Sequence, residues 1–431
     1  VFRRAAPSAG PGGAAAAPWI DLVEGEARIA LGEGPSAVGM LESAVEGFTS
    51  GAGPVDRARW ALGLALAAGG RGPAARRMLD DARAAWTPPV SSHVDGLRVL
   101  FELALDDGAV DRAEATIREA WGLATDADDS AAMAVAQHGL ARLAWLTGQP
   151  ANALEPIALA FDALGHEPAP TAIVPVLIDA LEVELVLGRY HTAIHYADVL
   201  GGWTADLPIH RIRTLVSRAR ALIALGRPNE AEAPHEEAYA WLVSHGRVST
   251  EASLGAARNA CDLGRSAEAA ALIAALGDPP ASVATDPAGQ AMALRARAVA
   301  GTDAALATRL ANGALARPAA TSPVHTSLAR LDAAHALFAI GQVAPARAGA
   351  KHALKAQQGT GSRGPKLEVL LALAAFRPDA VILEAVVRAA GPVVADLPQA
   401  DAASLCARPL LAQALATVRS PSDPPTQPLS A

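Results

Sequence analysis

A glycine recurs along this 431-residue chain at intervals of 37 to 40 residues, and an alanine follows five residues after nearly every one. A fixed period of this length is the sequence signature of stacked structural repeats. In the eighth unit Leu306 stands where the alanine is expected, and a one-residue shift of that turn would account for it. The glycines are Gly32, Gly70, Gly108, Gly148, Gly188, Gly226, Gly264, Gly301 and Gly341, and the alanines are Ala37, Ala75, Ala113, Ala153, Ala193, Ala231, Ala269 and Ala346.

The composition favours helices over strands. Apolar residues make up 51% of the chain but aromatic residues only 4%, so Ala, Leu and Val dominate. Ala and Leu are strong helix formers, whereas a large β fold would need more aromatic and β-branched residues. A glycine just past a helix end adopts the left-handed conformation without a Cβ clash. We therefore expect each unit to be helix A, a tight turn at the glycine, and helix B, stacked on its neighbours because one pair cannot bury its apolar face alone.

The turn of the fifth unit, Gly188-Arg189-Tyr190 followed by Ala193, is the closest local match to a known family. With a mostly small residue seven positions before each glycine, the pattern resembles the tetratricopeptide repeat (TPR). It departs from that family in its longer period, against the usual 34 residues, and in having mostly aliphatic residues at the family's aromatic positions. The resemblance implies an all-α fold: an α-solenoid forming a right-handed superhelix of nine to ten TPR-like helix-turn-helix repeats with a C-terminal capping helix. Long repeats of this kind are similar to those of bacterial signalling ATPases, regulators and scaffold proteins, which implies a bacterial protein acting in signal transduction.

We expect four segments along the chain. Residues 1–17, rich in Ala, Gly and Pro, are predicted to be a disordered lead-in, because they lack the apolar stretch of a secretory signal. Residues 18–358 carry repeats one to nine. Residues 359–419 hold a degenerate tenth repeat, which has lost its turn glycine, and a capping helix at about 399–418. Residues 420–431 form a Pro-rich tail that is predicted to be disordered.

Charge, cysteine count and hydropathy exclude several classes of protein. The formal net charge is −8, which disfavours direct binding of nucleic acid. Only Cys261 and Cys406 are present, too few for a disulfide framework or a Cys-rich zinc site, and this fits a reducing, cytoplasmic location. The longest apolar runs have eight residues, so no membrane span is predicted. The oligomeric state is left open.

No motif in the sequence indicates an enzyme, a cofactor or a metal site. The run from Gly359 to Gly364 has the Gly-x-Gly-x-x-Gly spacing of a dinucleotide site, but a helix and not a strand is expected before it, so we interpret it as a flexible linker. His191 and His195 share one helix face, with Asp198 as the nearest third ligand. We interpret them as surface histidines, and Cys261 as an ordinary buried cysteine.

The position six residues before each turn glycine is the best candidate for partner binding. By analogy with TPR proteins it faces the concave groove, and in the later repeats it is mostly Arg or His. Arg offers a planar donor fork that suits carboxylates and phosphates, so an acidic partner is expected. The alternative is that these arginines are only good helix formers on a solvated face. The predicted groove residues are Arg142, Glu182, Arg220, Arg258, Arg295 and His335, with Arg213 beside them.

Two functions remain open at this stage. The first is a non-catalytic protein–protein interaction scaffold that binds a peptide or protein partner in the concave groove. The second is a sensor or oligomerisation region of a larger bacterial signalling regulator (an ATPase, kinase or transcription factor), binding a small ligand or an inhibitor protein. An enzyme on an α/α toroid is disfavoured, because such folds line a deep pocket with aromatic residues that are scarce here.

Overall fold

The computed structural model describes residues 11–30, 33–49, 54–86, 88–165, 168–245, 249–279 and 282–418. Within these ranges all regular secondary structure is helical, which confirms the all-α prediction. The predicted tail at 420–431 and the first ten residues of the predicted lead-in lie outside them. Helix α1 begins at Pro11, seven residues before the first repeat was expected. None of the helices in the described part is both long and apolar enough to cross a membrane.

The chain divides into two compact units, residues 1–139 and 140–431, and the division falls within α7 (Ser130–Leu146). The N-terminal unit contains α1 (Pro11–Ala30), α2 (Gly34–Thr49), α3 (Val55–Ala68), α4 (Gly72–Ala85), α5 (Val90–Asp106) and α6 (Val110–Asp126). The C-terminal unit contains the 3-10 helix η2 (Pro150–Ala153), α8 (Leu154–Leu164), α9 (Pro170–Leu187), α10 (Tyr190–Trp203), α11 (Pro208–Ala224), α12 (Pro228–His245), α13 (Thr250–Asp262), α14 (Ser266–Leu276), α15 (Pro287–Val299), α16 (Ala304–Ala316), α17 (Pro323–Ala339), α18 (Val343–Ala356), α19 (Arg363–Phe376), α20 (Ala380–Ala395), α21 (Gln399–Cys406) and α22 (Pro409–Val418).

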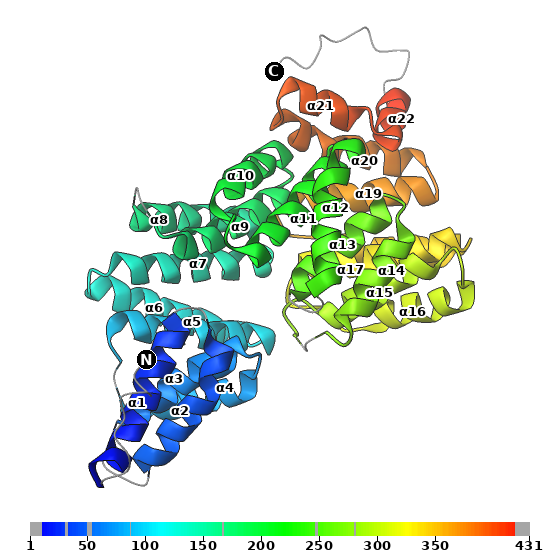
Figure 1. Ribbon diagram of the computed structural model, residues 1–431. Coiled ribbons are helices and arrows are strands. Elements are labelled where there is room, and N and C mark those ends of the chain that lie inside the picture. Colours follow the sequence, from blue (N-terminus) through cyan, green and yellow to red (C-terminus); the bar gives the residue numbers. More distant parts are fainter. Residues whose placement is uncertain are drawn as a thin grey trace. The chain divides into compact units, whose positions relative to one another are not determined.

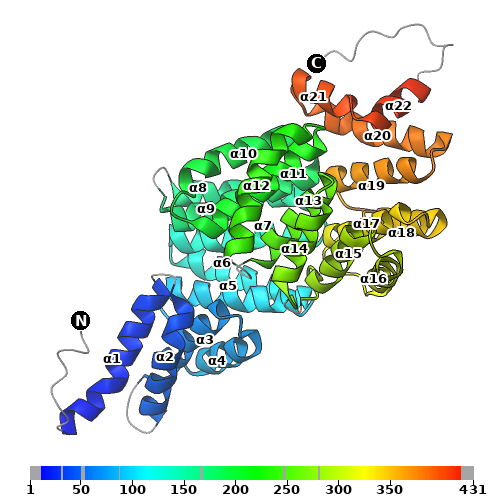
Figure 2. The ribbon, with the colours of Figure 1, turned by 45° about the vertical axis from the view of Figure 1, so that its right-hand side comes forward.

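Within each unit the helices pack in successive pairs, A against B and each pair against the next, so the architecture is an α-solenoid (Figures 1 and 2). The turn glycines end the A helices as predicted. Gly188 has φ +77°, and the next amide, that of Arg189, donates to the carbonyl oxygen of Glu184 at 2.9 Å. This bond back to the last helical turn is the Schellman motif. The same left-handed glycine occurs at Gly70, Gly108, Gly148, Gly226, Gly264 and Gly341, whereas Gly32 lies outside the described residues.

The eighth repeat shows the expected one-residue shift. Gly301 does not take the left-handed conformation, and Asp303 instead caps α16 by accepting from the amide of Leu306 at 2.8 Å. Ala307 is fully buried in the position that alanine fills elsewhere, whereas Leu306 is only partly buried. The shift therefore moves every later position of this repeat by one residue.

The alanines five residues after each glycine form the centre of the packing between hairpins. All eight are at most 1% exposed, and the list is Ala37, Ala75, Ala113, Ala153, Ala193, Ala231, Ala269 and Ala346. Only a small side chain fits where two helices cross this closely, and close packing leaves little tolerance for a larger one. The repeat seen in the sequence is thus a packing requirement.

In the C-terminal unit the solenoid closes on itself after five repeats. Helix α9 of repeat five contacts α19 of repeat ten. A Cβ built on Gly364 would lie 2.5 Å from the carbonyl oxygen of Leu185 and 3.4 Å from the Cα of Gly188. One repeat earlier, a Cβ on Gly148 would meet Pro323, and one repeat later the turn at Gly226 lies against Arg408. Successive turns of helices therefore touch within this unit.

Two expectations for the C-terminal region need correction. The run from Gly359 to Gly364 is not a flexible linker, because Gly364 is buried in α19 against the turn of repeat five. The predicted capping helix at 399–418 is two helices, α21 and α22, with the break just before Pro409. A proline ring cannot follow a continuing helix without a clash, which explains the break.

Candidate functional site

Six of the seven predicted groove residues lie on A helices of the C-terminal unit and contact a neighbouring A helix. Arg142 of α7 pairs with Asp179 of α9 at 3.4 Å, and Arg213 of α11 pairs with Glu251 of α13 at 3.1 Å. Glu182 and Arg220 lie 3.7 Å apart, Arg258 binds two other helices, and His335 packs edge-on against Phe376. These residues lie on adjacent A helices, but their charges are paired with side chains of neighbouring helices.

Arg295 does not belong to this group. Its side chain is exposed on α15, and the inner position is taken by Arg297. The one-residue shift of the eighth turn does not by itself place Arg297 there, since the two arginines are two residues apart. The position six residues before the turn glycine therefore gives the wrong residue in this repeat, because the turn has no left-handed glycine to fix the register.

A network of two arginines and two aspartates, of which Arg258 and Asp332 are buried, joins α13, α15 and α17. Arg258 Nε donates to Asp332 Oδ2 at 2.9 Å, and Arg297 Nη1 donates to Asp332 Oδ1 at 3.1 Å. Arg297 Nη2 also donates to Asp262 Oδ1 at 2.6 Å. Arg258 is 8% exposed and Asp332 2% exposed. Because a buried charge is tolerated only when it is paired and hydrogen-bonded, we read this network as a structural clamp between these helices.

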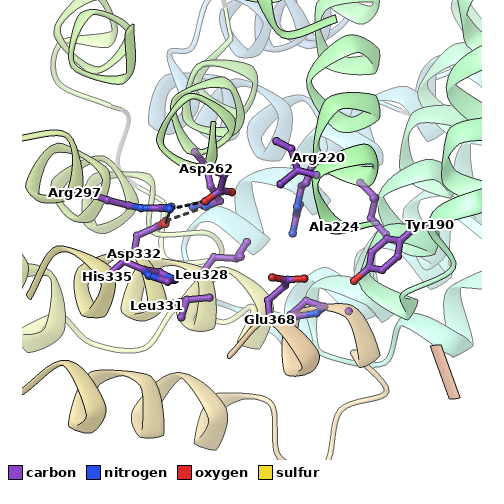
Figure 3. Close-up of a pocket in the computed structure, with 15 residues that line it drawn as sticks. Tyr190, Arg220, Ala224, Asp262, Arg297, Leu328, Leu331, Asp332, His335 and Glu368 are labelled. Atoms are coloured by element: carbon purple, nitrogen blue, oxygen red, sulfur yellow. Dashed lines mark hydrogen bonds and ion pairs between the residues drawn. The ribbon is translucent and has the colours of Figure 1, made fainter. Parts of the chain in front are cut away.

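Beside this network lies a cavity of about 90 Å³ (Figure 3). Its lining comes from α9, α10, α11, α13, α15, α17 and α19, so both touching turns of the solenoid contribute. The charged and polar residues are Tyr190, Arg220, Arg258, Asp262, Arg297, Asp332, His335 and Glu368, and the others are Leu185, Ile223, Ala224, Leu328, Leu331, Gly364 and Pro365. Three arginines and three carboxylates balance each other around the cavity.

Each carboxylate of the lining is bound by an arginine. Glu368 of α19 receives two hydrogen bonds from Arg408, at 2.5 and 2.9 Å. Asp262 and Asp332 receive theirs from the arginines of this network. Figure 3 shows Arg220 and Tyr190 directed toward the space above Glu368. No hydrogen bond joins either of these two side chains to another described residue.

Burial shifts the pKa of several groups around the cavity. It lowers the pKa of His335 to about 4, with a smaller contribution from the charge of Arg297, so this imidazole is neutral at physiological pH. Burial also raises the pKa of Tyr190, which keeps its hydroxyl protonated. The Cys261 thiol, on α13, has its pKa raised to about 12 by burial, as expected for an unreactive cysteine.

A second charged group lies toward the start of the A helices. The charge of Arg213 lowers the pKa of Glu251, and Arg142 adds to this effect. Glu251 nevertheless keeps 57% of its side chain exposed, whereas Arg213 keeps 23%. Burial lowers the pKa of the nearby His325 to about 4. Glu251 is thus a carboxylate of this inner surface that remains open to solvent beside a predicted groove arginine.

Of the histidine pair on α10, His191 makes a contact with the C-terminal cap. His191 Nδ1 lies 2.8 Å from Asp401 Oδ2, on α21, and so joins repeat five to the cap. Over the residues that the structure describes, no three His, Cys, Asp or Glu side chains are grouped to hold a metal ion. His191 and His195 are both exposed, as interpreted from the sequence.

Sequence reasoning missed Tyr190, Arg297, Asp332 and Glu368. Tyr190 was seen only as part of the turn motif, and its buried position depends on the contact with α19. Asp332 carries a signal, since an acid in the middle of an apolar helix needs a partner, but the sequence does not name that partner. Glu368 lies in a repeat without a turn glycine, so its register was undefined.

No protein-family model matches the sequence, and no curated protein matches it. Among solved structures, a chain of the crystal structure of the APC/C hetero-tetramer Cut9-Hcn1 is similar at 12% sequence identity. The alignment covers 94% of this chain and 90% of that one, with a TM-score of 0.37. This likeness is too weak to indicate what the chain binds. The class of the protein, an all-α repeat protein, rests on its own helices and turns.

Proposed function

We propose that this chain is a non-catalytic protein-interaction scaffold. A protein or peptide partner docks on the A helices of the C-terminal unit, near their N-terminal ends. A solenoid presents an extended surface of side chains from successive repeats, and this geometry suits the binding of another chain. The resemblance to tetratricopeptide repeats points in the same direction.

The observation that supports the docking position is the Arg213–Glu251 pair. Arg258 and Arg297 are committed to buried carboxylates, so a partner cannot reach them without unfolding the clamp. In contrast, Glu251 keeps more than half of its side chain in solvent. It contacts Arg213 through one carboxylate oxygen, at 3.1 Å. An acidic side chain of a partner can replace Glu251 at Arg213 at little cost, because partly exposed ion pairs contribute roughly 0–1 kcal/mol.

Affinity capture with charge-reversed variants tests this proposal. Tagged wild-type chain, Arg213→Glu and Arg211→Glu are compared by quantitative mass spectrometry of the proteins they retain. Arg211 is the matched control, because it lies on the same helix and pairs on the surface with Glu237 at 2.6 Å. We expect a partner that Arg213→Glu retains about tenfold less, with retention by the wild type falling as salt rises. Equal retention by all three proteins would contradict docking at Arg213.

A second candidate, the sensor region of a larger regulator, is favoured by one observation. A cavity of the C-terminal unit is lined by both charged and apolar side chains, and the Tyr190 hydroxyl in it makes no hydrogen bond with a described residue. A binding site for a small ligand would account for such a cavity.

A further inference from the structure

Two groups that make no hydrogen bond with a described residue face the same cavity. Tyr190 is 2% exposed, and its hydroxyl lies beside Gly364, where it makes no hydrogen bond with any described residue. Arg220 has one ion pair, to Glu182 at 3.7 Å, and this is too long for a hydrogen bond. Figure 3 shows both side chains directed into the cavity.

The nearby carboxylates also bind other groups. Glu182 accepts a hydrogen bond from the hydroxyl of Ser217, one turn before Arg220 on α11. Glu368, on the opposite wall, is held by Arg408 through both carboxylate oxygens. Tyr190 is 2% exposed, whereas Arg220 keeps 26% of its side chain in solvent. A guanidinium and a hydroxyl that face one cavity without a hydrogen bond to the protein suit a bound species that supplies acceptor oxygens.

The size and walls of the cavity restrict that species. A water needs roughly 10–15 Å³ on the scale in which the cavity measures about 90 Å³, so there is room for about seven heavy atoms. The guanidinium fork of arginine matches the two oxygens of a carboxylate. Leu185, Leu328 and Leu331 supply an apolar part of the wall, beside the arginines and carboxylates that pair with each other.

We propose that this cavity binds a small organic monocarboxylate. The carboxylate accepts hydrogen bonds from the Arg220 guanidinium and the Tyr190 hydroxyl, and a short apolar body contacts Leu185, Leu328 and Leu331. Inorganic phosphate lacks that body and fits less well. The inference rests on the second candidate function, and it is independent of docking at Arg213, which does not line the cavity.

The position of the cavity gives such a ligand a structural effect. Tyr190 belongs to repeat five and Arg220 to repeat six. Leu328 and Leu331 belong to repeat nine, and Glu368 belongs to repeat ten. A ligand held between them braces the two touching turns of the solenoid. Because it binds the folded chain only, its binding raises the melting temperature, and the rise continues with the logarithm of ligand concentration above the Kd.

Calorimetric titration of the full chain with isovalerate, a carboxylate of seven heavy atoms, tests the proposal. We expect saturable binding at one site and a concentration-dependent rise in melting temperature. The amide isovaleramide has the same shape without the charge, and we expect it and inorganic phosphate to bind at least about tenfold more weakly. Absence of saturable isovalerate binding would overturn the proposal, as would equal binding of the amide or of phosphate.

Variants locate the binding site. We expect Arg220→Gln to weaken isovalerate binding by at least about tenfold and Tyr190→Phe by about threefold to tenfold, in line with the loss of a charged and of a neutral hydrogen bond. Arg218→Gln is the control, because Arg218 lies on the same helix but pairs outside the cavity with Asp198 at 3.0 Å. If Arg220→Gln fails to fold, Tyr190→Phe decides, since it removes one oxygen and keeps the ring. Wild-type affinity in Tyr190→Phe would place the site elsewhere, whatever the outcome of the capture experiment at Arg213.

Discussion

Arg408 and Glu368 form a two-point ion pair, with Nη1–Oε1 and Nη2–Oε2 distances of 2.5 and 2.9 Å. Arg408 Nη1 also donates to the backbone carbonyl oxygen of Ala224 at 2.9 Å. Arg408 precedes α22, Glu368 lies on α19, and Ala224 ends α11. One guanidinium therefore joins repeat six, repeat ten and the cap, and it helps to hold the two turns of the C-terminal unit together.

Removing this guanidinium is expected to destabilise the C-terminal unit. Arg408→Met keeps much of the apolar stem but leaves Glu368 and the Ala224 carbonyl without their donor, and we expect a loss of about 2–3 kcal/mol in urea denaturation followed by circular dichroism. Arg388→Met is the control, because Arg388 pairs with Glu384 on the same helix and both side chains are more than half exposed. Its loss should stay below about 0.5 kcal/mol. Similar losses in both variants would show that Arg408 is not a link between turns.

Gly364 is expected to be intolerant of any side chain. The Cβ of Gly364→Ala would lie 2.5 Å from the Leu185 carbonyl oxygen, which forces α19 away from α9. Overpacking of this kind costs about 1–3 kcal/mol, and melting temperature measures it. Gly391→Ala is a matched control: Gly391 also precedes a proline within a helix, so the steric cost before a proline ring is shared, but no atom lies within 4 Å of its Cβ position. A larger drop for Gly391→Ala would contradict the close approach of α19 to repeat five.

Much of the fold was predictable, because it is set by contacts between neighbours in sequence. The glycine at each turn and the alanine five residues later are local requirements, and the buried alanines confirm them from Ala37 to Ala346. The closure after five repeats was not predictable. It depends on small angles between successive hairpins that add up, and on single contacts such as that of Gly364 with Leu185. No residue that recurs with the repeat period predicts those contacts.

The candidate site, like the fold, could be predicted only in part. The inner row of charged residues was identified from its spacing, but the partners of those residues were not, since Asp332 is distant in sequence from Arg258. At the eighth repeat the column selected Arg295, whereas Arg297 makes the buried contacts. A turn without a left-handed glycine loses the reference point from which the column is counted.

The two arginines of α15 therefore provide a direct comparison. Arg297→Ala leaves Asp332 and Asp262 each without one partner, and we expect a loss of about 3 kcal/mol, as found when one member of a buried pair is removed. Arg295→Ala removes an exposed side chain that has no partner among the described residues, and alanine is the better helix former, so stability should change by less than about 0.5 kcal/mol. Chemical denaturation of both variants decides between the two registers. A greater loss for Arg295→Ala would restore the register predicted from the sequence.

His335 should make the stability of the chain fall as the pH is lowered. In the folded chain burial lowers its pKa to about 4, whereas an unfolded histidine titrates at about 6.5. Between these values the unfolded chain binds a proton that the folded chain does not, so stability is lost as pH falls from about 6.5 to 4. The groups that face the ring are Arg297, Asp262, Asp332 and Glu368, and the first of these charges acts in the same direction as burial.

The contribution of His335 is measured as a difference between pH 7 and pH 5. His335→Gln removes the titrating group, so we expect the variant to lose about 2 kcal/mol less than the wild type over this interval. His325 has its pKa lowered in the same way, and its effect cancels because both proteins retain it. His352→Gln, at an exposed position of α18, should follow the wild type. If His335→Gln also followed the wild type, the ring of His335 would be protonated within the fold, and the cavity would be more open to water than its contacts indicate.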